Sequence, residues 1–274
     1  VHSSLGVHSA SSSSAAPHVS LASSSRVLAA YHSGKKASIA PGVPPVPKVP
    51  KTIFHPTLTL YQIDQEEFAR QLTILDSHVF VSIKPSELLN QSWNKPKLKH
   101  LAPNVLRMVN MFNQLSHSVS TLILAGQKPR ERAKIIEWWI KVAEHCKQMN
   151  NFHGMMAVVS GINSGPTVRL KASRREISKT LMDQLSSFES IFESEGSFSA
   201  YRTALYSAEP PLIPYLGIHL TDLTFIEEGN KDMQAHLINF AKRRLLYQTI
   251  SGLQNFQQTI YNFQPVRQIQ DIIA

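Results

Sequence analysis

The feature that most constrains this chain is a helical period that recurs from residue 53 onward. Apolar side chains step by three and four residues along one long stretch: Val105, Met108, Val109, Phe112, Leu115, Val119, Leu122 and Ile123. That spacing places them on one face of a helix. A second stretch, from about 130 to 149, repeats the pattern. No segment alternates apolar and polar residues over the length of a strand, so we predict an all-α domain.

Capping residues predict where several helices begin. Asp64 is a good N-cap, Glu67 stands at the third helical position as in a capping box, and Ile63 and Phe68 have the spacing of a hydrophobic staple. Asn104 is expected to cap the next long helix. These signals place one helix start after residue 64 and another after residue 104.

Three further segments complete the helical prediction. The short apolar run 152–162 fits a strand or a buried helix, and its helical neighbours favour helix. An amphipathic segment spans about 181–191. The last long helix is expected from about 231 to 257.

Residues 1–52 differ in composition from the rest of the chain. They are rich in serine, alanine and proline, and they have no sustained apolar period, so we expect a disordered linker. They also hold five basic residues and no acid, out of a net charge of +9 for the chain. Residues 53–274 are therefore only mildly basic. With no dense basic stripe and no interleaved aromatics, they give no sign of nucleic-acid binding.

The usual catalytic and metal motifs are missing from the sequence. No histidine pair has HExxH spacing, and no phosphate-binding GxxxxGK[ST] or dinucleotide-binding GxGxxG is present. "GINSG" around Ser164 is out of step with a nucleophile elbow, so we interpret it as a turn. The single cysteine, Cys146, lies at helical spacing among apolar residues and is expected in the core. No apolar run is long enough to cross a bilayer.

The segment "LTDLTFIEEGNKD", residues 220–232, breaks a local rule. If Gly229 stops a helix there, Glu227 and Glu228 lie in its last turn, where the helix dipole is already negative. Each such carboxylate typically costs from a few tenths of a kcal/mol to about 1 kcal/mol. Composition alone leaves two interpretations open, a solvated helix end or a working surface.

Five blocks carry a resemblance to a known family. They are "ARQLTILDSHVFVSIKPSELLNQSW", "APNVLRMVNMFNQLS", "ERAKIIEWWIKVAEHCKQMNNFHGMMAVVSGINSGPTVRL", "PPLIPYLGIHLTDLTFIEEGN" and "LINFAKRRLLYQTISGLQNFQ". In this order and at these distances, from about residue 57 to 270, the chain resembles the catalytic domain of Ras-family guanine nucleotide exchange factors. The resemblance implies a single helical, bowl-like domain over 53–274 with a protruding helical hairpin.

The resemblance also implies how the hairpin works. Gly229 would stop the first helix, Asn230 would cap the second, and a two-residue connection would join them. In the family this hairpin pulls the first switch of a small GTPase away from the nucleotide. By similarity, Thr224 lies toward the magnesium site and Glu228 toward the phosphates, four residues apart and therefore on one face. Some relatives have a bulkier apolar residue at Thr224, so steric exclusion of magnesium is weaker here.

Contacts to the GTPase are expected from five residues: Asn151, Leu220, Thr221, Asp222 and Asn230. For Asn151 a helix C-cap is an equally good interpretation. Trp138, Trp139, Phe152 and Tyr201 are expected in the core. Lys242, Arg243 and Arg244 follow the hairpin and are expected to pair with acids or to face solvent.

The expected function is therefore nucleotide exchange on a Ras-like GTPase of the Ras, Rap or Ral type, without covalent chemistry, metal or cofactor. Two alternatives are a degenerate relative that only binds the GTPase as a scaffold, and a helical protease or esterase, for which no nucleophile and base pair stands out. The expected location is the cytoplasm, either free or peripheral at membranes where the GTPase is anchored. Residues 1–52 are too short and too polar to be the helical companion module that usually precedes such domains.

Overall fold

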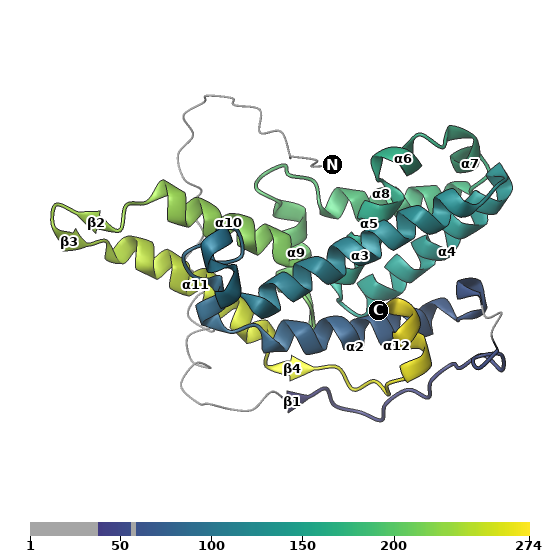
Figure 1. Cartoon of the computed structure of the whole chain (residues 1–274), viewed down its shortest axis with the longest axis horizontal. Coiled ribbons are helices and arrows are strands. Elements are labelled where there is room, and N and C mark those ends of the chain that lie inside the picture. Colours follow the sequence, from purple (N-terminus) through teal and green to yellow (C-terminus); the bar gives the residue numbers. More distant parts are fainter. Residues whose placement is uncertain (1–37, 56–58) are drawn as a thin grey trace. The chain divides into compact units, whose positions relative to one another are not determined.

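The computed structural model describes residues 38–55 and 59–274, and it is mostly helical (Figure 1). The predicted all-α class is thus confirmed. The helical elements are η2 (Leu60–Gln62), α2 (Gln65–Ser82), η3 (Pro85–Leu88), η4 (Pro96–Leu101), α3 (Pro103–Ala125), α4 (Pro129–Gln148), α5 (Phe152–Ile162), α6 (Gly165–Val168), α7 (Lys171–Arg175), α8 (Lys179–Ile191), α9 (Ser199–Ser207), α10 (Leu216–Gly229), α11 (Phe240–Phe256) and α12 (Arg267–Ile273). Four two-residue strands accompany them: β1 (Ser38–Ile39), β2 (Met233–Gln234), β3 (Leu237–Ile238) and β4 (Thr259–Ile260).

The larger apolar core lies among α2, α3, α4, α5, α8 and α9. Aromatic rings dominate its centre, where Phe68 of α2 meets the edges of Trp138 and Trp139 at centroid distances of 5.2 and 5.4 Å. Phe152 and Tyr201 are buried in the same cluster, as is Cys146. The predicted core positions of these residues are confirmed, and so are the helices predicted over 130–149, 152–162 and 181–191.

The close approach of α3 and α5 depends on a glycine. A Cβ atom added at Gly161 would lie 2.6 Å from the carbonyl oxygen of Ser116 and 2.6 Å from Cβ of Val119. No side chain fits in that space, so the two helices can pack at this distance only with glycine on α5.

A second apolar cluster supports α10 and α11. It joins the end of α2 and the start of α3 to the facing sides of the two helices, through residues such as Phe80, Val105, Leu223 and Leu246. The base of the hairpin is therefore fixed to the domain by buried side chains. Figure 1 shows α10 and α11 side by side, with β2 and β3 at their far end.

The start of α3 is capped from a distance. The expected cap at Asn104 is wrong, because Asn104 is the second residue of the helix and Ala102 is its N-cap. The buried carboxylate of Glu87, in η3, instead accepts bonds from the backbone N–H groups of Asn104 and Val105 at 2.7 and 3.2 Å. Two free N–H groups at the helix start thus find their acceptor 17 and 18 residues earlier.

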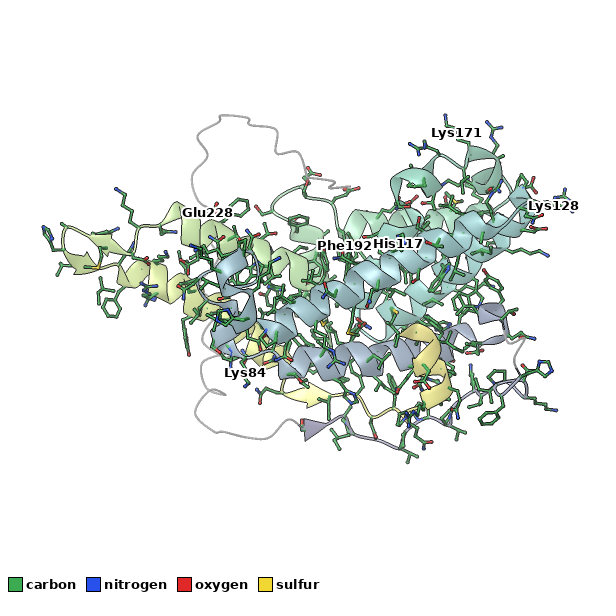
Figure 2. The ribbon with its side chains drawn as sticks, viewed as in Figure 1. Lys84, His117, Lys128, Lys171, Phe192 and Glu228 are labelled. Atoms are coloured by element: carbon green, nitrogen blue, oxygen red, sulfur yellow. The ribbon has the colours of Figure 1, made fainter. Side chains whose placement is uncertain are left out.

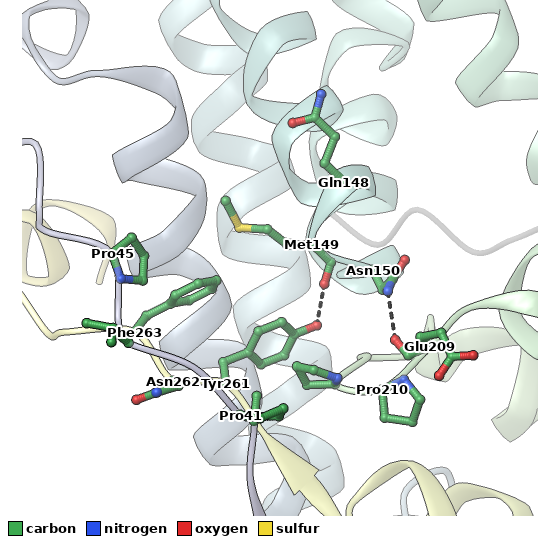
Figure 3. Close-up of a pocket in the computed structure, with 13 residues that line it drawn as sticks. Pro41, Pro45, Gln148, Met149, Asn150, Glu209, Pro210, Tyr261, Asn262 and Phe263 are labelled. Carbon is green, nitrogen blue, oxygen red and sulfur yellow. Dashed lines mark hydrogen bonds between the residues drawn. The ribbon is translucent and has the colours of Figure 1, made fainter.

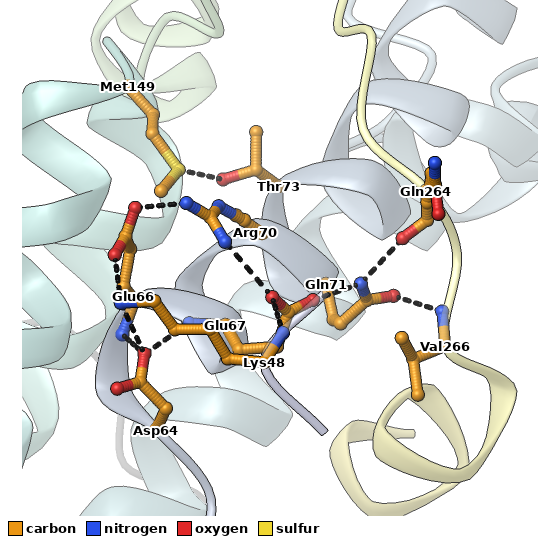
Figure 4. Close-up of polar contacts among 10 residues, drawn as sticks. All are labelled: Lys48, Asp64, Glu66, Glu67, Arg70, Gln71, Thr73, Met149, Gln264 and Val266. Atoms are coloured by element: carbon orange, nitrogen blue, oxygen red, sulfur yellow. Dashed lines mark hydrogen bonds and ion pairs between the residues drawn. The ribbon is translucent and has the colours of Figure 1, made fainter. Parts of the chain in front are cut away.

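The start of α2 is capped as predicted, but Glu67 has a different partner set. Asp64 Oδ1 accepts from the backbone N–H groups of Glu66 and Glu67, each at 3.1 Å. The Glu67 side chain does not close a capping box. It is buried and accepts from the Lys48 backbone N–H at 2.9 Å, from Arg70 Nη1 at 3.1 Å and from Gln71 Nε2 at 2.7 Å (Figure 4).

Residues 38–51 form a strap that packs on the domain. β1 pairs in parallel with β4, and Asn262 Nδ2 donates to the carbonyl of Gly42 at 2.7 Å. Lys48 Nζ pairs with Glu66 at 2.6 Å. The prediction of a disordered linker is therefore wrong for residues 38–52. The segment lacks an apolar face, but long-range backbone pairing and ion pairs hold it on the domain. The rest of the predicted linker, 1–37, lies outside the described residues.

The strap gives a testable stability difference. A chain that starts at residue 38 should unfold at the same temperature as residues 1–274. A chain that starts at residue 53 should lose about 1–3 kcal/mol, because buried Glu67 loses a donor and β4 loses its partner strand. Thermal unfolding of the three chains measures this. Equal stability of the shortest chain would contradict a structural role for the strap.

Candidate functional site

The last turn of α10 carries two carboxylates with different surroundings. Glu227 is largely buried, and its Oε2 lies 2.6 Å from Lys242 Nζ. Glu228 is exposed, and its Oε1 accepts only a long bond of 3.4 Å from Gln91 Nε2. Adjacent helical residues point about 100° apart, so the two cannot act on one substrate atom. Glu227 is neutralised inside the fold, while the charge of Glu228 remains available.

The unfavourable helix end is compensated locally by one buried lysine. Lys242 Nζ also contacts Asp232 Oδ1 at 3.0 Å and donates to the Glu227 carbonyl at 3.2 Å. Burial disfavours the charge on Lys242, but its hydrogen bonds to Glu227 and Asp232 raise its pKa above the ordinary value. A cation at this position offsets the negative end of the α10 dipole. The expectation that the basic run pairs with acids is confirmed for Lys242 and for Arg243, which contacts Asp232 at 2.9 Å.

The connection between α10 and α11 is longer than predicted. Asn230 Nδ2 donates to the carbonyl of Ile226 at 3.0 Å, so Asn230 closes the end of α10 and does not cap α11. The N-cap of α11 is Asn239, whose Oδ1 accepts from the Lys242 backbone N–H at 3.2 Å. The predicted two-residue connection and the predicted helix start near residue 231 are therefore wrong.

The connection contains an antiparallel ribbon. Met233 pairs with Ile238 and Gln234 pairs with Leu237. The two loop residues, Ala235 and His236, have positive φ angles of 44° and 75°, as in the tight turns that join such strands. Leu237, Ile238 and the neighbouring Phe240 are exposed. The ribbon thus places an apolar tip beyond the carboxylate end of α10.

One stripe of α10 faces solvent beside Glu228. Thr221, Phe225 and Glu228 are exposed and follow one another by four and three residues, and Thr224 is half-buried between them. The hydroxyl of Thr224 donates to the Leu220 carbonyl at 2.9 Å. Phe225 was not among the predicted site residues, although its four-residue step from Thr221 could have identified it.

Two other predicted contact residues of α10 are engaged inside the fold. Leu220 is buried in the cluster under the hairpin, where it packs, and its contact with a partner stays a prediction. Asp222 accepts two bonds of 2.9 Å from Arg202 Nη2. Burial raises the pKa of Asp222, although Arg202 opposes that shift. Asp222 therefore tethers α10 to α9.

Asn151 is fully buried in the chain alone, and its contact with the GTPase stays a prediction. Its Oδ1 accepts from the Gly154 backbone N–H at 2.8 Å, so it caps the start of α5. Its Nδ2 donates to Asp76 Oδ2 at 2.9 Å and to Thr73 at 3.1 Å. The C-cap of α4 involves Asn150 instead, with a positive φ of 55°. The N–H groups of Asn150 and Asn151 bond to the carbonyls of Lys147 and Cys146, as in a Schellman motif.

The buried carboxyl group of Asp76 gives a pH prediction. Burial raises its pKa to about 7, against the opposing hydrogen bond from Asn151. A raised pKa means that the fold prefers the protonated form, so stability is lost as pH rises from 3.8 to about 7. Asp76→Asn should therefore stabilise the chain above this window by roughly 1–4 kcal/mol and have little effect below it. Denaturant unfolding at one pH below 3.8 and one above about 7 tests this, with the exposed Asp183→Asn as control. An equal change in the free energy of unfolding for Asp76→Asn at the two pH values would contradict the prediction.

Half-buried aromatic rings gather at the other end of α10. Tyr215, the N-cap of this helix, stacks on Phe112 of α3 at 5.2 Å and meets the edge of Phe192 at 5.8 Å. His153 packs beneath with its edge toward Phe112, and burial lowers its pKa to about 4. Figure 2 labels Phe192 and Glu228 at separate places on the domain. The helix between Tyr215 and Glu228 spans roughly 20 Å, which suits a protein partner better than a small ligand.

A cavity of about 360 Å³ lies elsewhere, under the strap (Figure 3). It is lined by strap residues, by the turn between α4 and α5, and by the segments around Pro210 and Tyr261. Tyr261 donates from its hydroxyl to the Met149 carbonyl at 2.6 Å across this region. None of the predicted site residues lines the cavity.

The described part of the chain holds neither a metal-binding cluster nor a membrane-spanning helix. Over 38–55 and 59–274, no three His, Cys, Asp or Glu side chains are grouped so that they could hold a metal ion. No helix in this part of the chain is both long and apolar enough to span a membrane.

Comparison with known proteins identifies the family of the chain. Residues 67–244 match the model of the RasGEF domain, and the chain belongs to that family. It is 48% identical over 236 residues to Ras guanine nucleotide exchange factor A of Dictyostelium discoideum. The aligned segment covers 84% of this chain and 39% of that protein. Factor J of the same organism is 46% identical over 240 residues, covering 87% of this chain and 30% of that protein. The chain thus spans about a third of the length of these relatives.

Proposed function

We propose that this chain is a guanine nucleotide exchange factor for a Ras-like small GTPase of the Ras, Rap or Ral type. The observation that carries the proposal is the free carboxylate of Glu228, presented at the end of α10 while its neighbour Glu227 is neutralised by Lys242. Membership of the RasGEF family and the names of the relatives support it. The chain makes and breaks no covalent bond in this function.

The proposed mechanism is competition for the nucleotide site. The hairpin enters the GTPase and displaces the first switch, and the stripe of exposed Thr221, Phe225 and Glu228 with half-buried Thr224 faces the emptied space. Glu228 repels the phosphates and pairs with the cation that binds them, since charge-assisted bonds of this type are strong. Thr224, four residues away, lies toward magnesium. No metal or cofactor resident in this chain takes part.

Two other surfaces support the same partner. The rings of Phe112, Phe192 and Tyr215 provide a half-buried apolar contact at the opposite end of α10. The exposed ribbon residues and Asn230 lie beside the carboxylate end. Asn151 is buried as the N-cap of α5 and acts by holding the turn between α4 and α5. That turn is joined to the segment just before α10, because the Ile213 N–H donates to the Asn150 carbonyl at 3.0 Å.

The proposal predicts reciprocal effects of nucleotide and exchange factor. If the chain weakens nucleotide binding by some factor, nucleotide must weaken binding of the chain by the same factor. The complex should therefore be tightest with nucleotide-free GTPase and should be dissociated by either GDP or GTP. A pull-down with Ras, Rap and Ral proteins measures this. A requirement for GTP would identify an effector instead, and binding without faster release of a fluorescent nucleotide would identify a scaffold.

The proposed location is the cytoplasm, at or away from the membranes that anchor the GTPase. Fractionation of cells that express the full protein would test this.

A further inference from the structure

Two basic segments that are far apart in the sequence meet at one end of the domain. The first is the start of α4 and the second runs from α6 through α7 to the start of α8. They are joined by the Arg130–Glu176 ion pair at 3.1 Å and by a bond of 2.9 Å from Arg132 Nε to Ser173 Oγ. Figure 2 shows Lys128 and Lys171 at this end, well away from Glu228.

Six cations at this end are exposed and have no acidic partner among the described residues. We name this surface the basic end and define it by these side chains: Lys128, Lys134, Arg169, Lys171, Arg175 and Lys179. The two acids within segments 124–134 and 165–179 have other partners, since Glu176 pairs with Arg130 and Glu131 accepts from the backbone N–H groups of Gln127 and Lys128. Segments 124–134 and 165–179 together hold nine Lys and Arg residues against two acids, so the basic end is strongly positive in net charge.

The chemistry around these cations favours a lipid surface over nucleic acid. Segments 124–134 and 165–179 contain no Phe, Tyr or Trp, so they offer no ring on which a base could stack. They do expose two aliphatic side chains, Leu124 and Val168. Flexible cations with aliphatic side chains between them match the headgroup region of an anionic bilayer, which needs no groove or fixed geometry.

We propose that the basic end is a docking surface for an anionic phospholipid bilayer. Each Lys or Arg near such a surface contributes about 1 kcal/mol, so six together suffice for reversible attachment. The attraction is screened at high salt because the Debye length shrinks. The hairpin lies far from the basic end, so its carboxylate face stays free while the domain is attached.

The test measures binding of the whole 274-residue chain to vesicles, without any GTPase. Vesicles of phosphatidylcholine with about 30% phosphatidylserine should bind the chain at about 0.1 M salt, and pure phosphatidylcholine vesicles should not. Combined Lys128→Gln, Arg169→Gln, Lys171→Gln and Arg175→Gln substitutions should weaken binding at least about tenfold. Thermal unfolding checks that this variant folds.

A matched variant removes the same charge elsewhere. Lys95→Gln, Lys97→Gln, Lys99→Gln and Arg107→Gln together neutralise four exposed cations in and just before η4 and in α3, and they should leave vesicle binding nearly unchanged. The proposal is overturned if both variants lose binding equally, because binding then follows net charge alone. It is also overturned if anionic vesicles fail to bind, or if an oligonucleotide or an acidic polypeptide binds at salt concentrations where the vesicles do not.

Discussion

Glu228→Ala is expected to slow nucleotide release from the GTPase by at least about tenfold, which corresponds to roughly 1.4 kcal/mol of lost transition-state stabilisation. The side chain is exposed, and among residues 38–55 and 59–274 it accepts a single long bond, from Gln91. Its removal should therefore leave the unfolding temperature unchanged or slightly higher, since an unfavourable charge leaves the end of α10. Fluorescent-nucleotide release and thermal unfolding, measured on the same preparation, separate the two effects.

Two further variants sharpen this result. Glu228→Gln keeps the shape of the side chain and should be nearly as slow as Glu228→Ala if charge is the active property. Asp271→Ala removes a carboxylate from the last turn of α12, where it is exposed and 4.0 Å from Arg267. That control should leave exchange unaffected. An unmutated release rate for Glu228→Ala would refute the role proposed for Glu228.

Lys242→Met should produce the largest loss of stability, about 3 kcal/mol. The substitution leaves Glu227 buried without its counter-charge and removes the donor to the Glu227 carbonyl. Arg243→Met is the matched control, because its pair with Asp232 is exposed and should contribute less than about 1 kcal/mol. Denaturant unfolding of both variants gives the comparison.

A double-mutant cycle identifies the cause. Glu227→Leu should restore most of the stability lost in Lys242→Met, because the pair is then replaced by apolar side chains. Additive losses would show instead that the two residues act independently, which would contradict the ion pair as the element that holds the end of α10.

Local periodicity predicted the helices well, and long-range contacts caused the errors. The helices over 129–148 and 179–191 have strong apolar faces, so a single stretch of sequence determines them. The cap at Asn104 failed because its acceptor, Glu87, lies in a preceding element. The strap was missed because its partners are distant in sequence: Thr259 of β4 pairs with Ser38, and Glu67 of α2 binds Lys48 from 19 residues away.

The hairpin shows the same limit within a shorter segment. Met233 and Leu237 are four residues apart and fit a helical period, and no glycine or proline lies between them to mark the turn. The positive φ angle at Ala235 is uncommon for a residue other than glycine, and histidine adopts such angles more readily, as His236 does. Of the candidate site, Glu228 and Thr224 could be placed on one helical face from sequence. The sequence could not show that Glu227 is neutralised while Glu228 stays exposed, since that depends on which of the two carboxylates Lys242 contacts.

The contacts of Gln71 bear on where an autonomous folding unit begins and ends. Its side chain donates to the Gln264 carbonyl at 2.9 Å and accepts from the Val266 backbone N–H at 2.8 Å (Figure 4). Those partners, like Lys48 on the other side of Glu67, lie outside residues 67–244, the span that the family shares most recognisably. A fragment limited to residues 67–244 would expose the side chains of Glu67 and Gln71, which are buried in the longer chain. The segment that matches the family is thus shorter than the segment needed for autonomous folding, which also includes Lys48, Gln264 and Val266.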